Sequence, residues 1–248
     1  MIEQTKHLLG KMKLLGMLSA LDVRIHEAST QGWAALEFIS ALATDEKLYR
    51  ENQGIKRRIK AAQFRTDASL EKLDFTAKRS LTKAQVSELK TLKFVKDPRN
   101  VILMGPTGVG KTYLATAIGN HACQEGFGVI FLGVNLFIER TQMARDDGSF
   151  LRLRDRLIKT DVLILDDLGI KKLTASAVQD LYDILEERYQ TKSTIITSQL
   201  PIKNWKEVID DQVAFEAIVD RLIHGAIRLE IKGESYRKKR GGEEKPSK

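Results

Sequence analysis

The chain has 248 residues, with 41 Lys and Arg against 33 Asp and Glu, which gives a formal net charge of +8. It carries one cysteine, Cys123, and no apolar run approaches the roughly 18 residues of a membrane span. These features argue against a disulfide scaffold and a membrane protein, and 42% apolar residues suffice for a core. The basic balance favours a polyanionic partner such as nucleic acid. We expect a cytoplasmic protein with no membrane partner.

Residues 1–66 predict a small all-helical domain. Apolar residues from Leu8 to Leu21 recur at steps of three and four, the period of one helix face. A further segment, 55–62, carries a dense basic face, and the first proline of the chain is Pro98. The helices of this region are therefore free of the strongest helix breaker.

From residue 100 onward, short apolar runs alternate with helical patterns, which is typical of parallel strands joined by right-handed crossovers. We predict an α/β domain over 100–237 with a five-stranded parallel sheet between helices. A linker (67–99) with one helix precedes it, and a basic disordered tail (238–248) follows. The predicted strands are 101–104, 129–132, 162–165, 193–197 and 227–231, and the predicted helices include 111–124, 135–145 and 175–190, the last capped by Thr174.

Residues 105–112 read Gly-Pro-Thr-Gly-Val-Gly-Lys-Thr, a complete G-x-x-x-x-G-K-[ST] phosphate-binding loop set between a strand and a helix. Glycines let the backbone wrap a phosphate, and the helix N-terminus adds about half a positive charge. The pattern predicts that Lys111 reaches the phosphates of ATP and that the Thr112 hydroxyl coordinates Mg²⁺. The predicted nucleotide contacts are Gly105, Pro106, Thr107, Gly108, Val109, Gly110, Lys111, Thr112 and Tyr113.

Polar side chains follow two of the other predicted strands. Asp166 ends one strand and is predicted to hold Mg²⁺ through water, while Asp167 polarises the attacking water as general base. Ser198 follows the strand that we expect between this one and the phosphate loop. It is predicted to sense the γ-phosphate, with a plain loop cap as the alternative. Arg221 can reach a neighbouring subunit as an arginine finger, but its spacing alone favours a surface Asp–Arg pair.

The motifs GPTGVGKT, LILDDLG, RYQTKSTIITSQ, DRLIHG and GESYR occur in this order. With them the chain resembles the IstB-like helper ATPases of bacterial insertion sequences, which are related to DnaC-type helicase loaders and to DnaA within the AAA+ class. The resemblance runs over about residues 1–240 in layout. It implies Walker A and B roles at the loop and the two acids, a first sensor at Ser198, an arginine finger at Arg221 and a second sensor at Arg237.

Two features depart from the usual AAA+ pattern. Asp167 stands where many AAA+ ATPases carry Glu, so hydrolysis is expected to be slow. Few residues follow Tyr236 in this sequence, so we do not expect the usual helical lid near Arg237.

Three basic stretches compete as the DNA contact: one near 56–65, one over 140–159, and the pair Lys171-Lys172. Lysine and arginine contacts to phosphates give strong, largely sequence-independent binding. The resemblance favours the second stretch, because relatives of this type place an extra helix there, facing DNA. The predicted contacts are Arg140, Arg145, Arg152, Arg154, Arg156, Lys171 and Lys172.

Together these features predict an AAA+ ATPase that forms homo-oligomers on double-stranded DNA and hands that DNA to a cognate transposase. The alternatives are a helicase loader acting on single strands, a DNA-shaping scaffold in which ATP is only a switch, and a small-molecule P-loop kinase. The helical domain is assigned to subunit, DNA or transposase contact without a choice among them.

Overall fold

The computed structural model describes residues 1–75 and 80–233. The chain forms two compact units, Met1–Arg57 and Arg58 onward, and the boundary falls within one long helix. The predicted end of the helical domain, residue 66, lies nine residues later than this boundary. The predicted tail at 238–248 lies outside the described residues.

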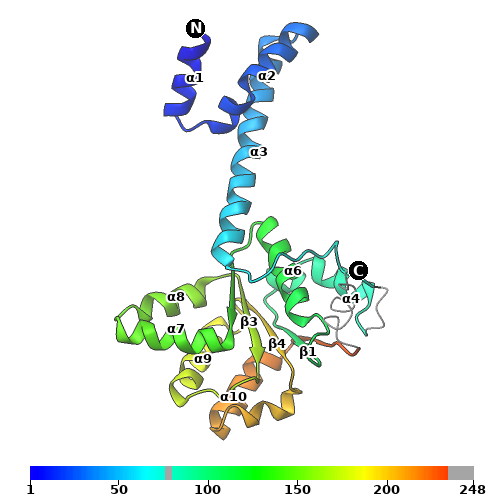
Figure 1. Cartoon of the computed structure of the whole chain (residues 1–248), viewed down its shortest axis with the longest axis vertical. Coiled ribbons are helices and arrows are strands. Elements are labelled where there is room, and N and C mark those ends of the chain that lie inside the picture. The colour runs from blue at the N-terminus through cyan, green and yellow to red at the C-terminus, as the bar shows by residue number, and fades with distance from the viewer. Residues whose placement is uncertain (76–79, 234–248) are drawn as a thin grey trace, which may run out of the picture. The chain divides into compact units, whose positions relative to one another are not determined.

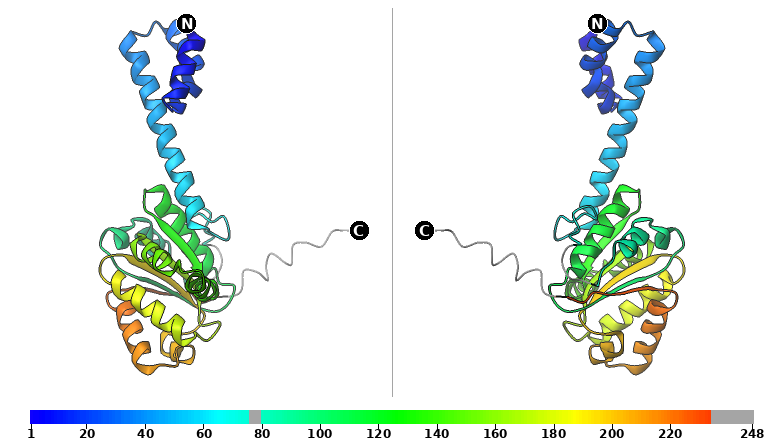
Figure 2. Two further views of the ribbon diagram at one scale, coloured as in Figure 1. Left: turned by 90° about the vertical axis from the view of Figure 1, so that its left-hand side faces the viewer. Right: turned by 90° about the vertical axis from the view of Figure 1, so that its right-hand side faces the viewer.

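The N-terminal unit is helical, as predicted, and consists of α1 (Ile2–Lys11), α2 (Leu15–Gln31) and the first part of α3 (Ala35–Ala62). Figure 2 shows α2 running alongside α3. A Cβ added at Gly16 would lie 2.6 Å from the Cα of Glu46, so the glycine permits a close helix approach. The Glu46 carboxylate accepts hydrogen bonds from the N–H groups at the start of α2, where the helix dipole favours a negative charge.

The second unit is built on a five-stranded sheet in the order β2-β3-β4-β1-β5, and all its pairings are parallel (Figure 1). The predicted α/β fold with five parallel strands is therefore confirmed. Both faces of the sheet are covered, which explains why the strands read as continuous apolar runs. The strands are β1 (Val101–Met104), β2 (Val129–Gly133), β3 (Val162–Leu168), β4 (Ser193–Ser198) and β5 (Ile227–Glu230).

Helices pack on both faces of the sheet, and each face has its own apolar core. One face is covered by α4 (Lys83–Lys90), α5 (Lys93–Lys96) and α6 (Lys111–Gln124). The helices of the other face are α7 (Val134–Asp146), α8 (Phe150–Lys159), α9 (Ala175–Arg188) and α10 (Gln212–Ile223), with the 3₁₀ helix η1 (Ile202–Glu207). Thr174 caps α9 through a hydrogen bond from the Ala177 N–H, as predicted.

The stretch treated as a linker in the sequence, 67–99, contributes to the core of the second unit. Its apolar side chains are buried against α6 and the sheet, and the Asn120 amide donates to the Ala68 carbonyl. Val86, Leu89 and Leu92 follow the three-residue step of the one predicted helix, but the buried residues at 68–73 are spaced irregularly among polar ones, so no period marks them in the sequence. The buried members are Ala68, Leu70, Leu73, Val86, Leu89, Leu92, Phe94 and Val95.

Within the described residues, no helix has the length and apolar character needed to cross a membrane.

Candidate nucleotide-binding site

The phosphate loop joins the end of β1 to the start of α6. Gly105 has a φ of 146°, and a Cβ there would lie 2.1 Å from the carbonyl oxygen of Ile231, which follows β5. Gly110, directly before α6, has a φ of 98°. Only glycine accommodates these backbone positions without strain. The loop therefore directs the N-terminus of α6 at whatever anion it encloses.

The Lys111 ammonium lies inside this loop. Its Nζ donates to the carbonyl oxygens of Gly105 at 2.7 Å and Pro106 at 2.9 Å, and the residue is buried. The Val109 side chain is buried in the core and anchors the loop to it. The loop is thus held in a wrapped form in which its lysine already faces inward.

Asp166 lies at the end of β3 and is almost completely buried. Its Oδ1 accepts hydrogen bonds from Thr112 Oγ1 at 3.0 Å and Thr197 Oγ1 at 2.7 Å. Among the described residues, no hydrogen-bond partner reaches its buried Oδ2. Burial raises the pKa of the Asp166 carboxyl above its ordinary value.

This arrangement fits Mg²⁺. The ion prefers oxygen ligands and is commonly bound through one or two carboxylates together with waters and substrate phosphates. Thr112 supplies a hydroxyl at the mouth of the phosphate loop, and the second oxygen of Asp166 lies buried without a protein partner among the described residues. The residues predicted for the metal are therefore adjacent.

Asp167 follows with a left-handed backbone, at a φ of 64°, which aspartate tolerates better than most residues. Its N–H donates to Thr197 Oγ1 at 2.9 Å, and the half-buried residue lines the same pocket as Lys111 and Thr112. The two acids and the phosphate loop therefore meet at the carboxyl end of the sheet.

The structure does not support the predicted γ-phosphate sensor at Ser198. That hydroxyl is completely buried on the α9 side of the sheet, where it donates to the Leu168 carbonyl and accepts from Trp205 Nε1. The next residue, Gln199, lines the pocket and accepts a 2.6 Å hydrogen bond from Thr107 of the phosphate loop. The polar end of β4 thus reaches the site through Gln199.

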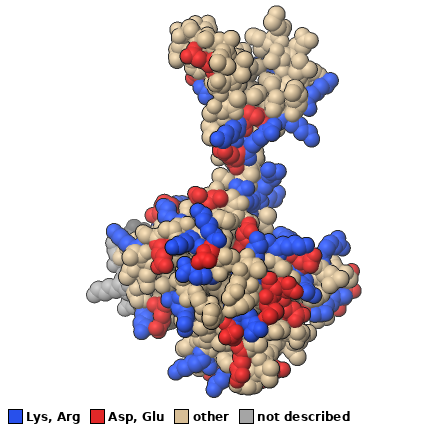
Figure 3. Space-filling view, turned by 180° about the vertical axis from the view of Figure 1, so that it is seen from behind, with Lys and Arg blue, Asp and Glu red and all other residues tan. Residues whose placement is uncertain are grey.

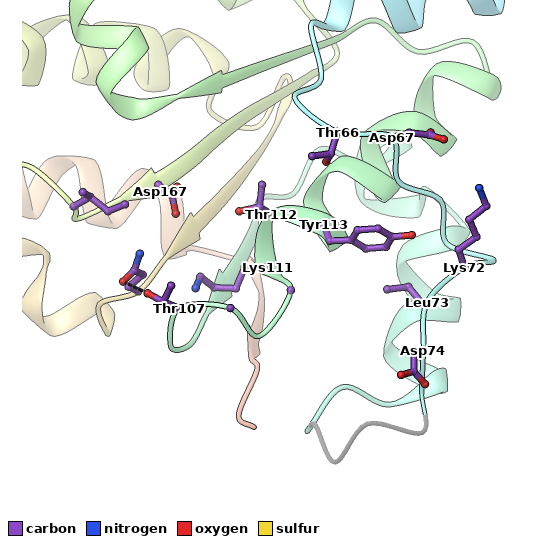
Figure 4. Close-up of a pocket in the computed structure, with 14 residues that line it drawn as sticks. Thr66, Asp67, Lys72, Leu73, Asp74, Thr107, Lys111, Thr112, Tyr113 and Asp167 are labelled. Atoms are coloured by element: carbon purple, nitrogen blue, oxygen red, sulfur yellow. Dashed lines mark hydrogen bonds between the residues drawn. The ribbon is translucent and has the colours of Figure 1, made fainter. Parts of the chain in front are cut away.

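The pocket itself has a volume of about 670 Å³, which suits a nucleotide. The phosphate loop and α6 form one wall, and residues 66–74 form the other (Figure 4). Figure 4 shows the Tyr113 ring extending from α6 towards this segment, where its hydroxyl contacts the backbone of Ser69. The sequence does not predict this wall, because its polar lining of Thr66, Asp67, Lys72 and Asp74 carries no motif.

Arg221 lies far from the pocket of its own chain. Its backbone carbonyl accepts from the Asn100 amide at the amino end of β1, whereas the phosphate loop follows the carboxyl end. The four residues of β1 span roughly 13 Å. The guanidinium contacts Glu186 of α9 at 2.5 Å and Asp220 at 3.3 Å, and it lowers the pKa of Glu186.

Two of the predicted DNA contacts form ion pairs with aspartates. Arg145 pairs with the buried carboxylate of Asp180 on α9 and stacks 3.9 Å from the ring centre of Phe150, so it fixes the turn between α7 and α8. Lys172 pairs with Asp210 at 2.9 Å. The buried Asp180 carboxylate requires a cation, so we do not propose Arg145 as a DNA contact.

The remaining basic residues after β2 lie mainly on α8. Arg152, Arg156 and Lys171 are exposed, and Arg156 also donates to the Ala61 carbonyl at 3.4 Å. Arg140 is half-buried, and the Nε of Arg154 is buried without a hydrogen-bond partner in the described part of the chain. Figure 3 shows Lys and Arg interspersed with Asp and Glu on the face it presents. Arg237 lies outside the described residues.

Comparison with known proteins identifies the family. A family model described as IstB-like ATP binding protein matches residues 7–243. The chain belongs to the IstB-like ATP-binding family. A protein of Sinorhizobium fredii, named as an insertion-sequence ATP-binding protein, is 36% identical over 230 residues, which cover 93% of this chain and 94% of the relative. The predicted family resemblance is therefore confirmed.

Solved structures confirm the AAA+ fold of this IstB-like protein. The structure of DnaI matches with a TM-score of 0.58 and 23% identity, covering 72% of this chain and 98% of that one. A structure of the replication initiator DnaA bound to AMPPCP and single-stranded DNA matches with a TM-score of 0.58 and 19% identity. That match covers 69% of this chain and about half, 52%, of the DnaA chain.

Proposed function

We propose that this IstB-like protein is a Mg²⁺-dependent ATPase that assembles on double-stranded target DNA as a homo-oligomer and delivers that DNA to a cognate transposase in the cytoplasm. The observation that carries the proposal is the convergence of Lys111, Thr112 and Asp167 on one pocket, with the Asp166 carboxylate hydrogen-bonded to Thr112. The insertion-sequence names of the family's relatives support the transposition context.

In this proposal the triphosphate lies in the loop between Gly105 and Thr112. Lys111 exchanges its carbonyl contacts for the phosphates, since an ammonium binds a phosphate more strongly than a neutral carbonyl. The base lies against the wall formed by residues 66–74 and Tyr113. Binding therefore ties the segment that follows α3 to the phosphate loop.

Thr112 and Asp166 hold Mg²⁺, which when bound neutralises charge that develops on the transferring phosphoryl group. Asp167 orients and polarises the attacking water, because its carboxylate belongs to the same pocket but is not committed to Thr112 or Thr197. Gln199 replaces Ser198 as the proposed γ-phosphate sensor, since its amide can exchange the Thr107 hydroxyl for a phosphate oxygen.

Arg221 completes the site of a neighbouring subunit. It lies at the end of the sheet opposite its own phosphate loop, so an arginine at this position serves a nucleotide bound by another copy. ATP then favours assembly because its γ-phosphate supplies the anionic partner of the arginine. Hydrolysis weakens assembly because that partner leaves.

DNA contact is proposed for the exposed cations of α8 and the β3–α9 connection, with Arg152, Arg156 and Lys171 at its centre and Arg140, Arg154 and Lys172 at its margin. Such contacts bind phosphates without reading bases. A helicase loader would share the ATPase site, and therefore the type of DNA bound separates the two functions.

Sedimentation with a duplex of about 50 base pairs and with the matching single strand tests the proposal, each with ATP, ADP or no nucleotide. We expect ATP-dependent assembly on the duplex. Assembly only on the single strand would favour a helicase loader, and assembly on neither would overturn a DNA function. Arg152→Glu should weaken assembly, whereas the matched charge reversal Lys206→Glu, at an exposed position of η1, should not.

A further inference from the structure

Strand β3 contains a bulge at its two acids. Leu165 pairs with Ile196 and Leu168 pairs with Ser198, so Asp166 and Asp167 together oppose the single residue Thr197 on β4. A bulge leaves one residue without its ladder partner and changes the direction of its side chain. Here it allows Asp167 to line the pocket while the preceding Asp166 contacts Thr112 of the same site, although consecutive residues of a regular strand point to opposite faces.

The Thr197 hydroxyl is hydrogen-bonded to both residues of the bulge. Its Oγ1 donates to Asp166 Oδ1 at 2.7 Å and accepts from the Asp167 N–H at 2.9 Å. The side chain is completely buried, so water cannot replace either bond without rearrangement. A hydroxyl combines one donor with acceptor lone pairs, and the site needs both. Valine has the same shape and provides neither.

The contact also selects which carboxylate oxygen of Asp166 is used. Thr197 and Thr112 both donate to Oδ1, which leaves Oδ2 without a hydrogen-bond partner among the described residues. Thr197 therefore fixes the rotation of the Asp166 carboxylate as well as the left-handed backbone of Asp167.

We propose that Thr197 is a positioning residue that sets the geometry of the metal-binding acid and of the water-polarising acid at once. The inference rests on the proposed ATPase function. It predicts that loss of the hydroxyl disturbs Mg²⁺ use and turnover while nucleotide binding through the phosphate loop persists, because the loop makes its contacts from β1 and α6.

A matched control is available on α6. Thr116 is also a completely buried threonine, but in the described part of the chain its hydroxyl has no hydrogen-bond partner. Thr116→Val therefore makes the same chemical change in a core position without removing a hydrogen bond. Thr197→Ser keeps the hydroxyl and loses only a methyl group.

The first measurement is hydrogen exchange of the Asp167 amide in metal-free, nucleotide-free protein. We expect the amide to be protected in the wild type, in Thr197→Ser and in Thr116→Val, and to exchange at least about tenfold faster in Thr197→Val. An unprotected amide in the wild type would overturn the inference, and this result does not depend on whether Thr197→Val folds.

The second measurement compares ADP affinity with and without Mg²⁺, together with ATP turnover. Thr197→Val should keep its Mg²⁺-free affinity within about twofold, lose the Mg²⁺-dependent gain in affinity and turn over roughly 10- to 100-fold more slowly. Thr197→Ser should recover most of both. Wild-type Mg²⁺ dependence and turnover in Thr197→Val would overturn the inference. Absence of turnover in the wild type would instead contradict the proposed ATPase, while exchange and Mg²⁺-dependent binding still test Thr197.

Discussion

Buried polar clusters lie at both ends of strand β4, one built around a cation and the other around two carboxylates. At the amino end, Ser193 and Thr194 accept from Arg188, whose guanidinium also donates to the carbonyls of Leu157, Ile158 and Thr160 at the end of α8. At the carboxyl end, Thr197 is hydrogen-bonded to the two acids of β3, of which Asp167 lines the nucleotide pocket.

The clusters differ in how completely their polar atoms are satisfied. Arg188 is buried and makes hydrogen bonds through Nε, Nη1 and Nη2, and burial lowers the pKa of its guanidinium to about 9. Asp166 is equally buried, yet its Oδ2 has no partner among the described residues. A satisfied buried network serves structure, whereas an unsatisfied buried oxygen calls for an explanation such as a ligand. One strand therefore stabilises the fold at one end and binds at the other.

Removal of the Arg188 guanidinium at the amino end of β4 should have the largest effect, and it should act on the stability of the fold. Arg188→Leu leaves the carbonyls at the end of α8 and at β4 without their buried donor, so we expect a loss of about 3 kcal/mol in the free energy of unfolding. Urea denaturation measures it, and Arg152→Leu at an exposed position of α8 should change stability by less than about 0.5 kcal/mol. Equal stability of both variants would show that the network is not structural.

A second test concerns nucleotide binding and removes the charge of Lys111 from the phosphate loop. Lys111→Ala should lower ATP affinity at least about 100-fold, because the ammonium supplies the central charge of the loop. Titration calorimetry measures this effect. Lys72→Ala, which removes the same charge from the opposite pocket wall, should change affinity by less than about threefold. Similar losses in both variants would mean that general charge, rather than the loop, binds the nucleotide.

Asp167→Asn separates the activation of water from nucleotide binding at the carboxyl end of β4. Asparagine tolerates the left-handed backbone, so the bulge should persist while the base is lost. We expect turnover to fall about 100-fold, with ATP still bound and the assembled form trapped on DNA. Single-turnover kinetics and sedimentation measure the two effects. Unchanged turnover would reject the assignment of Asp167 as general base.

Much of the nucleotide site at the carboxyl end of β4 could be predicted from the sequence, because its main residues lie in contiguous motifs. The phosphate loop and the acids after β3 are contiguous motifs, and the structure brings Lys111, Thr112 and Asp166 together. The sequence favours Ser198, whereas the structure places Gln199 at the pocket, and the difference arises because both faces of β4 are buried. Its apolar residues do not alternate with polar ones, and the sequence does not reveal which face each polar residue occupies.

Other features depend on contacts distant in sequence. The bulge that brings Thr197 opposite both acids is a property of strand pairing, and nothing in the β4 sequence marks it. Arg188 and Asp180 read as ordinary charged positions of a surface helix, yet both are buried by α7 and α8. The wall at 66–74 likewise becomes visible only when the segment packs beside α6.

The central claim is that one chain leaves the nucleotide site incomplete and that a neighbour's Arg221 completes it. Turnover of Lys111→Ala and Arg221→Ala, measured separately and mixed in equal amounts on duplex DNA, tests this claim most directly. We expect each variant alone to be nearly inactive. The mixture should recover up to about a quarter of wild-type turnover, because about a quarter of its interfaces pair an intact loop with an intact arginine. No recovery in a mixture that still assembles would contradict the shared site.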